Sequence, residues 1–374
     1  MSELKVAIVG CGKIADGHVE QVQKLSSLAR VVAVCDLEVL MAEQLARRYD
    51  VPAHYDDFAR LLERENPDVV HITTPPSSHL ALTRMSLDAG AHVYAEKPIT
   101  PTSADTEALV QLCEDAKKKL TVGWTYLFDP PALVMRDLIA RGEIGDPVHV
   151  ESNYGYNLAG PYGSAIMGDA NNWVHRLPGG LYQNNVDHLL NKLVEFFPHD
   201  EDPRVIAFGA RQRPQRFGDA RDDMVDELRL MIAGERVTAS GVFSSHARPM
   251  AHLCRVHGTK NTVTVDYNSR AVTLEATAEL PSALGRLVPA FDRAAQFARE
   301  GLRNVERFAK SDFHFFAGLY NLIERFYLSI RDDGPPPISH RDIRWVTRRL
   351  QDIIDQVERD RAAATGVIPV EVTP

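Results

Sequence analysis

The stretch KVAIVGCGKIA, residues 5–15, is the strongest indication of the fold, because it joins a β-rich apolar run to a glycine-rich turn. Residues 10–15 read GCGKIA, a GxGxxA motif that comes directly after the predicted strand and before a helical pattern. The first glycine allows a tight turn, the second lets the backbone approach a pyrophosphate, and the small third residue permits close packing of helix on strand. The N-terminus of the following helix favours an anion. We therefore expect a dinucleotide to bind at Gly10, Gly12, Lys13 and Ile14.

An acidic residue follows the motif at the spacing that a dinucleotide site requires. Asp36 ends the second predicted strand, VVAVCD at 31–36, about twenty residues further along the chain. A carboxylate there accepts a hydrogen bond from a ribose 2′-hydroxyl and repels a 2′-phosphate. The sequence therefore favours NAD as the cofactor and leaves NADP as the alternative.

Apolar runs alternate with helical patterns through the first third of the chain. The predicted strands are 5–10, 31–36, 68–75, 92–98 and 120–124, and the predicted helices between them are 18–28, 40–49, 57–64, 79–90 and 103–119. Ser103 is the expected N-cap of the last of these helices. This alternation predicts βαβ units and a doubly wound parallel sheet, which is a Rossmann domain over residues 1–124.

The pattern changes after about residue 146, where strands follow one another with little helix between them. These predicted strands are 147–157, 204–212, 226–234, 236–243, 252–258, 262–267 and 271–276, and helices follow at 284–309, 312–331 and 340–360. We expect a second α/β domain over residues 125–374, with a largely antiparallel open sheet and C-terminal helices that pack back on the first domain. An uncovered apolar sheet face is costly in water, so we also expect a homodimer or homotetramer.

Composition argues against several classes of protein. The chain has 374 residues, a formal net charge of −9 and a pI near 5.9, which disfavours a nucleic-acid-binding protein. Its four cysteines form no CxxC pair, which favours a reducing, cytoplasmic location. The chain contains no run of about 18 apolar residues, so we expect no membrane span. Its first residues do not resemble a secretory signal. The 14 histidines include no HExxH motif, and we expect no metal.

Two loops that follow predicted strands supply further candidate residues, because ligands of a doubly wound sheet bind outside the carboxyl ends of its strands. TTPPSSH spans residues 73–79, and Glu96-Lys97-Pro98 follows the next strand. An ammonium at Lys97, beside a nicotinamide, could hold a substrate hydroxyl and lower its pKa; the alternative is an ordinary surface turn. His79 either contacts the cofactor or begins a helix and faces water. The residues expected along the dinucleotide are Thr74, Pro75, His79, Glu96 and Lys97.

Together these motifs resemble the Gfo/Idh/MocA oxidoreductases, which include glucose–fructose oxidoreductase and inositol dehydrogenase. The resemblance covers nearly the whole chain, and EKP at 96–98 is its most specific signal. PGGLYQNNVDHLLN at 178–191 resembles the family's glycine-rich helix entry with a histidine, and GEIGDPVHVES at 142–152 resembles its entry into the second domain. The resemblance implies hydride transfer between NAD(P) and a hydroxyl-bearing carbon of a sugar, sugar derivative or cyclitol. It also implies that Lys97 is catalytic.

The histidine helix departs from the family pattern. Many members carry an Asp four residues before the active-site His, whereas Asn184 stands at that spacing from His188 in this chain. The family's strand-end Arg is replaced by Leu127. We therefore expect substrate recognition to differ from that of the well-studied sugar-specific members.

A helical projection at about 100° per residue places Asn184, His188, Asn191 and Glu195 on one side of an amphipathic helix. His188 then either faces water or lines the substrate cleft. In the second case it takes the hydroxyl proton as hydride leaves, because an unperturbed imidazole has a pKa of ~6.5. Trp173 is the candidate that could equally belong to the core. The expected substrate-binding residues are Lys97, Tyr126, Trp173, His175, Asn184, Asn185 and His188.

Three functions remain open at this stage. The first is an NAD(P)-dependent dehydrogenase in which Lys97 orients the substrate oxygen and His188 exchanges its proton. The second is an NAD-dependent glycosidase on the same scaffold, and the third is a non-enzymatic dinucleotide-binding regulator. The loss of the Asp at position 184 favours the regulator, whereas the EKP tripeptide and His188 favour an enzyme. The dehydrogenase hypothesis expects a small carbohydrate-like substrate and an active site that Lys97 and His188 complete from different domains.

Overall fold

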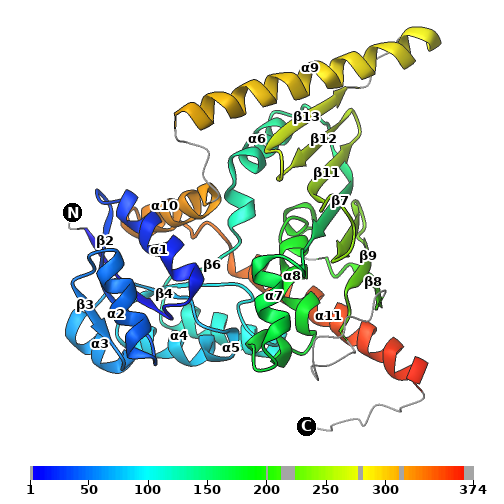
Figure 1. Ribbon diagram of the computed structural model, residues 1–374. Coiled ribbons are helices and arrows are strands. Elements are labelled where there is room, and N and C mark those ends of the chain that lie inside the picture. The colour runs from blue at the N-terminus through cyan, green and yellow to red at the C-terminus, as the bar shows by residue number, and fades with distance from the viewer. Residues whose placement is uncertain (1–2, 199–200, 212–223, 277–280, 311–315, 366–374) are drawn as a thin grey trace. The chain divides into compact units, whose positions relative to one another are not determined.

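The computed structural model describes residues 3–198, 201–211, 224–276, 281–310 and 316–365, and all structural statements below refer to these residues. The chain divides into two compact units (Figure 1). The first unit comprises Met1–Asp129 and His314–Thr347, and the second comprises Pro130–Phe313 and Arg348–Pro374. The sequence placed residues 314–347 with the second domain, whereas the structure groups them with the first. The reason is that helix α10, Ala317–Arg331, packs on α1, Lys13–Lys24, within the first unit.

The first unit is built on a six-stranded sheet in which every strand is parallel to its neighbours. Its order is β3-β2-β1-β4-β5-β6. The strands are β1 Leu4–Val9, β2 Ala29–Cys35, β3 Ala53–Tyr55, β4 Val69–Ile72, β5 His92–Ala95 and β6 Leu120–Val122. This confirms the predicted doubly wound parallel sheet. The three-residue β3 was not predicted, because it carries no apolar run. The strand order reverses between β1 and β4, which is the position where such sheets bind their ligands.

Helices cover the sheet of the first unit, as a parallel sheet with apolar strands requires. Besides α1 and α10 they are α2 Val39–Arg48, α3 Phe58–Glu65, α4 His79–Asp88 and α5 Ser103–Asp115, with 3-10 turns η1 Pro76–Ser78 and η2 Thr125–Phe128. The predicted N-cap at Ser103 is wrong by one residue. Thr102 has the extended backbone of an N-cap, and its hydroxyl accepts a hydrogen bond from the amide of Asp105 at 3.1 Å.

The second unit contains a seven-stranded sheet of order β13-β12-β11-β7-β10-β9-β8. The strands are β7 Pro147–Gly155, β8 Arg204–Ala210, β9 Glu227–Ala233, β10 Thr238–Ser244, β11 His252–Gly258, β12 Asn261–Asp266 and β13 Ala271–Ala276. Only the β7–β10 pair is parallel among these strands, so the predicted, largely antiparallel sheet is confirmed. Buried and exposed residues alternate along β9 and β10, which gives the sheet one covered face and one open face.

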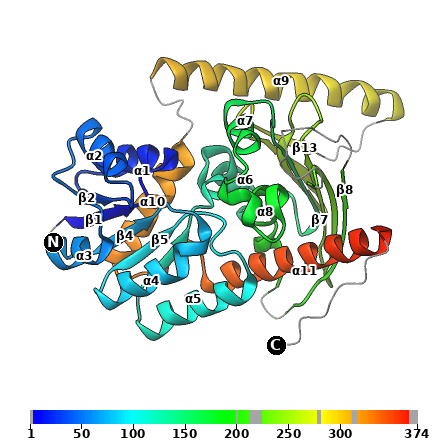
Figure 2. The same ribbon diagram turned by 60° about the horizontal axis from the view of Figure 1, so that its bottom comes forward.

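Helix α8, Gly180–Leu190, lies on β7 and β10 (Figure 2). A Cβ at Gly241 in β10 would come within 2.5 Å of the side chain of Leu189, so this glycine allows the helix to approach the sheet. The remaining helices of the second unit are α6 Pro130–Ala140, α7 Pro161–Gly168, η3 Trp173–Arg176, η4 Val194–Phe196, α9 Ser282–Ala309 and the later part of α11, His340–Thr365. Helices α6 and α7 were not predicted.

Helix α9 lies along the edge strand β13 (Figure 1). The Gln296 side chain accepts a hydrogen bond from the backbone amide of Leu274 at 2.8 Å and donates one to its carbonyl at 2.9 Å. This pairing occupies an exposed backbone position of β13, since edge strands carry unpaired amides and carbonyls.

None of the described helices is long and apolar enough to cross a membrane. Within the same residues, no three His, Cys, Asp or Glu side chains gather closely enough to hold a metal ion. All four cysteines are free and buried, and burial raises the pKa of each thiol to about 12. At neutral pH these thiols are therefore protonated and are not nucleophiles.

Candidate active site

The glycine loop after β1 adopts a conformation that only glycine accepts easily. Gly10 has φ +97°, and a Cβ at this position would lie 2.7 Å from the side chain and the backbone of Thr74. The Gly10 amide donates to the carbonyl of Cys35 at 2.8 Å, and the Thr73 hydroxyl donates to the Gly10 carbonyl at 2.6 Å. The loop therefore packs directly on the chain that follows β2 and β4.

The next glycine opens the start of α1 to a ligand. Gly12 is the N-cap of α1 and supplies no side-chain cap, so the first amides of the helix are left to other acceptors. A Cβ at Gly12 would meet no atom within 4 Å, which shows that the space in front of this helix end is open. Lys13 and Ile14 are the first residues of α1. This arrangement fits a pyrophosphate, which helix N-termini favour.

Asp36 lies directly after β2, beside the glycine loop. Its carboxylate accepts hydrogen bonds from the amide of Cys11 at 2.6 Å and from the amide of Glu38 at 3.0 Å. A carboxylate has about four acceptor positions, so these two bonds leave capacity for a ribose hydroxyl. The residues present therefore fit the adenosine end of a dinucleotide.

His79 is fully buried at the start of α4, so the alternative in which this histidine faces water is wrong. Its Nδ1 lies 2.8 Å from the carbonyl of Ile99, and its Nε2 lies 2.8 Å from the carbonyl of Thr74. Burial lowers the pKa of His79, against the two carbonyls, which raise it. The imidazole thus ties the Thr74-Pro75 loop to the chain that follows Lys97.

Lys97 is the half-buried residue in an otherwise buried stretch that runs from Val93 to Thr100. It follows β5 and precedes Pro98 through a cis peptide bond. Its amide donates to the Glu96 carboxylate at 3.1 Å. A Cβ at Gly123 would lie 2.6 Å from Glu96 Oε1, so the glycine after β6 makes room for this carboxylate.

The first unit therefore brings one group of predicted residues to the carboxyl edge of its sheet. Tyr126 belongs to the same unit, half-buried in η2 directly after β6. The group consists of Gly10, Gly12, Lys13, Ile14, Asp36, Thr74, Pro75, Glu96, Lys97 and Tyr126.

The second group lies in the second unit, around α8. Every residue from Leu181 to Leu190 is buried, so the alternative in which the polar side of this helix faces water is wrong. Asn184 and His188 are each 8% exposed, and the His188 ring lies 5.1 Å from the ring of Tyr154 in β7. Glu195 lies beyond the helix in η4, where its carboxylate pairs with Arg136 at 2.8 and 3.1 Å. The polar side of α8 faces protein because the sheet and neighbouring segments cover the helix.

Three other predicted residues of this unit make contacts that support the fold. The Asn185 side chain donates to the carbonyl of Leu181 one turn earlier, at 2.8 Å. His175 Nε2 donates to the carbonyl of Ile166 at 2.8 Å. Trp173 packs against an apolar cluster that includes Val174. A role for these three residues in substrate binding stays a prediction.

A buried lysine that was not predicted from the sequence lies near His188. Lys192 is 1% exposed, and its Nζ lies 5.9 Å from the ring centre of Tyr154 and 5.1 Å from that of Tyr267. Among the described residues this ammonium has no hydrogen-bond partner, and burial lowers its pKa to about 8. The only signal in the sequence is a single lysine inside the apolar run LLNKLVEFF, 189–197.

His252 in β11 completes this cluster. Its ring is edge-on to Tyr154 at 4.9 Å and stacked on Tyr267 at 4.5 Å. Burial lowers the pKa of His252 well below its ordinary value, and the charges of Lys192 and His188 lower it further. The buried surroundings of His188 are therefore cationic and aromatic, and they disfavour an additional positive charge.

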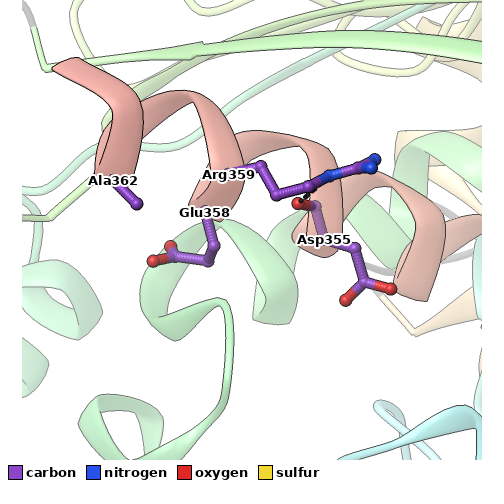
Figure 3. Close-up of a pocket in the computed structure, with 4 residues that line it drawn as sticks. All are labelled: Asp355, Glu358, Arg359 and Ala362. Atoms are coloured by element: carbon purple, nitrogen blue, oxygen red, sulfur yellow. Dashed lines mark hydrogen bonds between the residues drawn. The ribbon is translucent and has the colours of Figure 1, made fainter. Parts of the chain in front are cut away.

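A surface hollow on α11 does not coincide with any predicted site residue. Figure 3 shows that it is lined by Asp355, Glu358, Arg359 and Ala362. Arg359 donates to the Asp355 carbonyl at 3.1 Å, which is a contact within one helix. Charged side chains one turn apart on a helix are typical of a solvated surface, and we assign this hollow no chemistry.

Comparison with protein families agrees with both units. Residues 4–124 match the model described as "Oxidoreductase family, NAD-binding Rossmann fold", and residues 132–264 match the "GFO/IDH/MocA C-terminal domain". The chain belongs to the Gfo/Idh/MocA oxidoreductase family. Its first domain is accordingly an NAD-binding Rossmann domain, and the glycine loop and Asp36 described above lie inside the matched region.

Similar family members include dehydrogenases of cyclitols and sugars. The inositol 2-dehydrogenase of Salmonella paratyphi B is 30% identical over 158 residues, which are 42% of this chain and 47% of that protein. The D-glucoside 3-dehydrogenase of Escherichia coli is 30% identical over 145 residues, 39% of this chain and 41% of that protein. The chain thus matches about half the length of these curated relatives. A longer match, 27% identical over 275 residues, covers 73% of this chain and 78% of the inositol 2-dehydrogenase of Rhizobium meliloti.

Solved structures share the fold over the whole chain. Levoglucosan dehydrogenase, solved with NADH and levoglucosan, has a TM-score of 0.78 at 17% identity and covers 96% of this chain and 98% of its own. The WlbA dehydrogenase of Bordetella pertussis, solved with NADH and UDP-GlcNAcA, has a TM-score of 0.73 at 18% identity and covers 99% of both chains. At this level of identity the likeness establishes the architecture.

Proposed function

We propose that this family member is an NAD(P)-dependent dehydrogenase that acts on a CH–OH group of a sugar, a sugar derivative or a cyclitol. The main support is the carboxyl edge of the first sheet, where the half-buried Lys97 shares one rim with the glycine loop and Asp36. NAD fits better than NADP because Asp36 already places a negative charge beside the loop. The relatives named above act on cyclitols and sugar hydroxyls, which supports the same class of substrate.

In the proposed reaction the bound nicotinamide supplies the hydride acceptor, and the chain's own residues control the substrate oxygen. The Lys97 ammonium donates a hydrogen bond to the reacting hydroxyl and stabilises the negative charge that develops on it. His188 accepts the hydroxyl proton at a ring nitrogen. Asn184 stands where many relatives carry an Asp, so the base receives no support from a carboxylate at that position.

The deciding experiment is a panel of free sugars, cyclitols, sugar acids and nucleotide sugars, assayed with NAD and with NADP by the absorbance of the reduced cofactor. Lys97→Ala and His188→Ala should each lower turnover by about 10²–10⁴-fold. NADH binding should persist in both variants, because the glycine loop is unchanged. Normal turnover in either variant would contradict the assignment of that residue.

Two other outcomes would identify the alternative functions. Release of free sugar from a glycoside without net NADH formation would identify a glycosidase that uses its cofactor transiently. NADH binding without turnover of any substrate would identify a dinucleotide-binding regulator.

We also propose that the protein is a cytoplasmic homodimer or homotetramer that associates through the open face of the second sheet. Ile206 and Met231 are neighbours across β8 and β9, and Phe208 follows on the same face of β8. These side chains are 51%, 50% and 61% exposed, respectively, which is costly for a sheet that faces water. The four free, buried cysteines suit a reducing compartment.

A further inference from the structure

A chain of buried polar side chains leads from the carboxylate beside Lys97 into the core of the first unit. Glu96 Oε1 lies 3.0 Å from His18 Nε2. His18 Nδ1 lies 2.8 Å from His71 Nδ1, and His71 Nε2 lies 2.9 Å from the Tyr327 hydroxyl. The other carboxylate oxygen, Glu96 Oε2, accepts from the Lys97 amide at 3.1 Å. Four elements far apart in the sequence supply the members: α1, β4, the end of β5 and α10.

When both imidazoles are neutral, hydrogen bonds can be donated along these side chains in one direction only, from Tyr327 towards Glu96. An ionised Glu96 accepts only, so His18 must carry its proton on Nε2 and has a bare Nδ1. His71 must then donate from Nδ1 to that nitrogen, which leaves its own Nε2 to accept from the Tyr327 hydroxyl. Burial lowers the pKa of His71 well below its ordinary value and raises that of Tyr327 well above it. His71 and Tyr327 therefore stay neutral, as this arrangement of hydrogen bonds requires.

The surroundings hold the rings of the chain in place. His18, His71 and Tyr327 are fully buried, and Glu96 is 8% exposed. The Tyr94 ring stacks on His71 at 4.7 Å and stands edge-on to His18 at 5.0 Å. On the other side of Glu96, the carboxylate occupies the space that a side chain at position 123 would fill, because a Cβ at Gly123 would lie 2.6 Å from Oε1. Buried polar networks whose members are all satisfied are rigid, since each broken bond leaves an unpaired group in the core.

We propose that Tyr327, His71 and His18 are positioning residues for Lys97. Their one-way chain of donors holds the Glu96 carboxylate immobile beneath the turn that carries Lys97, and the carboxylate fixes the backbone of that turn through its amide. Helix α10 thereby contributes to the site although Tyr327 is far from Lys97 in the sequence. The inference rests on the proposed function in one respect: it takes Lys97 to be the residue that meets the substrate.

A holding role fits this chain better than the transport of protons. A proton wire needs an exposed end, whereas the three donors are fully buried. The Tyr327 hydroxyl, at the far end of the chain, makes only its bond to His71 among the described residues. The net effect of the chain is therefore on geometry at Glu96 and Lys97.

The structure offers a matched pair of variants. Tyr327→Phe removes the first donor of the chain and keeps the ring. Tyr94→Phe removes a hydroxyl from an equally buried tyrosine that also touches His71, but this hydroxyl has no hydrogen-bond partner among the described residues. Both variants keep the aromatic ring and its packing. A difference between them therefore measures the effect of the hydrogen bond from Tyr327 to His71.

The first measurement does not depend on turnover. Ring 15N spectra of the full-length protein at pH 7 should show His18 protonated on Nε2 and His71 protonated on Nδ1. In Tyr327→Phe the tautomers should become mixed, and the Lys97 amide should exchange with solvent about three- to tenfold faster, the effect of weakening one buried hydrogen bond. Tyr94→Phe should leave the tautomers and the Lys97 amide as they are in the wild type.

The second measurement is kinetic. Tyr327→Phe should lower kcat about three- to tenfold and leave the KM for the cofactor unchanged, because the glycine loop and Asp36 are untouched. Tyr94→Phe should keep kcat within twofold of the wild type. His18→Gln, which retains a side-chain N–H donor, should keep more activity than His18→Met, which has none.

The outcomes separate this inference from the proposed function. Equal effects of Tyr327→Phe and Tyr94→Phe, or the reverse tautomers in the wild type, would overturn the positioning chain and leave the dehydrogenase standing. Failure of the wild type to turn over any substrate would overturn the dehydrogenase. In that case Lys97 amide exchange in the two variants still decides whether the chain holds the turn.

Discussion

Lys192 illustrates how far one buried charged side chain can lower the free energy of unfolding. Burial lowers its pKa from 10.5 to about 8, and the aromatic rings of Tyr154 and Tyr267 replace water around the ammonium. Each pKa unit corresponds to about 1.4 kcal/mol, so the buried charge costs about 3 kcal/mol at neutral pH. The unfolded chain keeps this proton up to its ordinary pKa, whereas the folded protein loses it near pH 8. The free energy of unfolding therefore rises with pH between about 8 and 10.5 because of this group.

Lys192→Met should stabilise the protein at pH 7 by up to about 3 kcal/mol, since it removes the charge and keeps the length of the side chain. The difference in the free energy of unfolding between Lys192→Met and the wild type should shrink as the pH rises from 8 towards 10.5. Urea unfolding of both proteins at several pH values measures it. The exposed Lys24→Met is the control and should change the free energy of unfolding by less than about 0.5 kcal/mol. A pH-independent difference would show that Lys192 is not titrating in this window.

We expect Asp36 to determine the choice between NAD and NADP. Asp36→Ser should weaken NAD binding roughly ten- to hundredfold, the effect of losing a hydrogen bond to a charged group, and should favour NADP relative to NAD. Fluorescence titration with both reduced cofactors measures the change. Glu38→Ser removes an exposed carboxylate two residues away and should leave both affinities unchanged. Tighter binding of NADP than of NAD by the wild type would contradict the assignment of Asp36.

Within a single element, helix α8, the residue at position 184 should influence the protonation of His188. Asn184 precedes His188 by one turn, and the described helix is buried along its length. An amide carries no negative charge that could stabilise an imidazolium, and the nearby Lys192 and His252 carry no negative charge either.

Asn184→Asp should therefore raise the apparent pKa of the base by on the order of one unit, as a carboxylate beside a histidine does. The acid limb of the profile of kcat/KM against pH should move to higher pH. Asn184→Ala, which adds no charge, is the control and should leave the limb in place. An unmoved profile in Asn184→Asp, together with near-normal turnover in His188→Ala, would show that another residue is the base.

At the scale of the whole molecule, the open face of the second sheet predicts association. Met231→Glu places a charge in the exposed apolar group on β8 and β9 and should shift the protein towards monomer in sedimentation at micromolar concentration. Met41→Glu is the matched control, because Met41 is a similarly exposed methionine on α2 of the first unit. A wild-type protein that sediments as a monomer would rule out the proposed association.

Local patterns in the sequence were sufficient to predict the α/β architecture and the positions of the candidate residues in the first unit. Buried parallel strands are continuous apolar runs, and a strand–glycine turn–helix unit has local signals, so the parallel sheet, the glycine loop at residues 10–15 and the places of Asp36 and Lys97 followed from spacing. These features depend on neighbours in the chain, which periodicity can detect.

The surroundings of those residues could not be predicted from local patterns and became known from the folded protein. The projection of α8 placed Glu195 on a helix that ends before it, and it could not tell whether the polar side meets water or protein, because that depends on segments distant in sequence. His79 and Lys192 became buried for the same reason. The chain from Tyr327 to Glu96 joins residues from four elements, and no local pattern encodes a contact between α1, β4 and α10. Hydrogen bonds between remote side chains arise when packing brings them together, and that packing is a property of the whole fold.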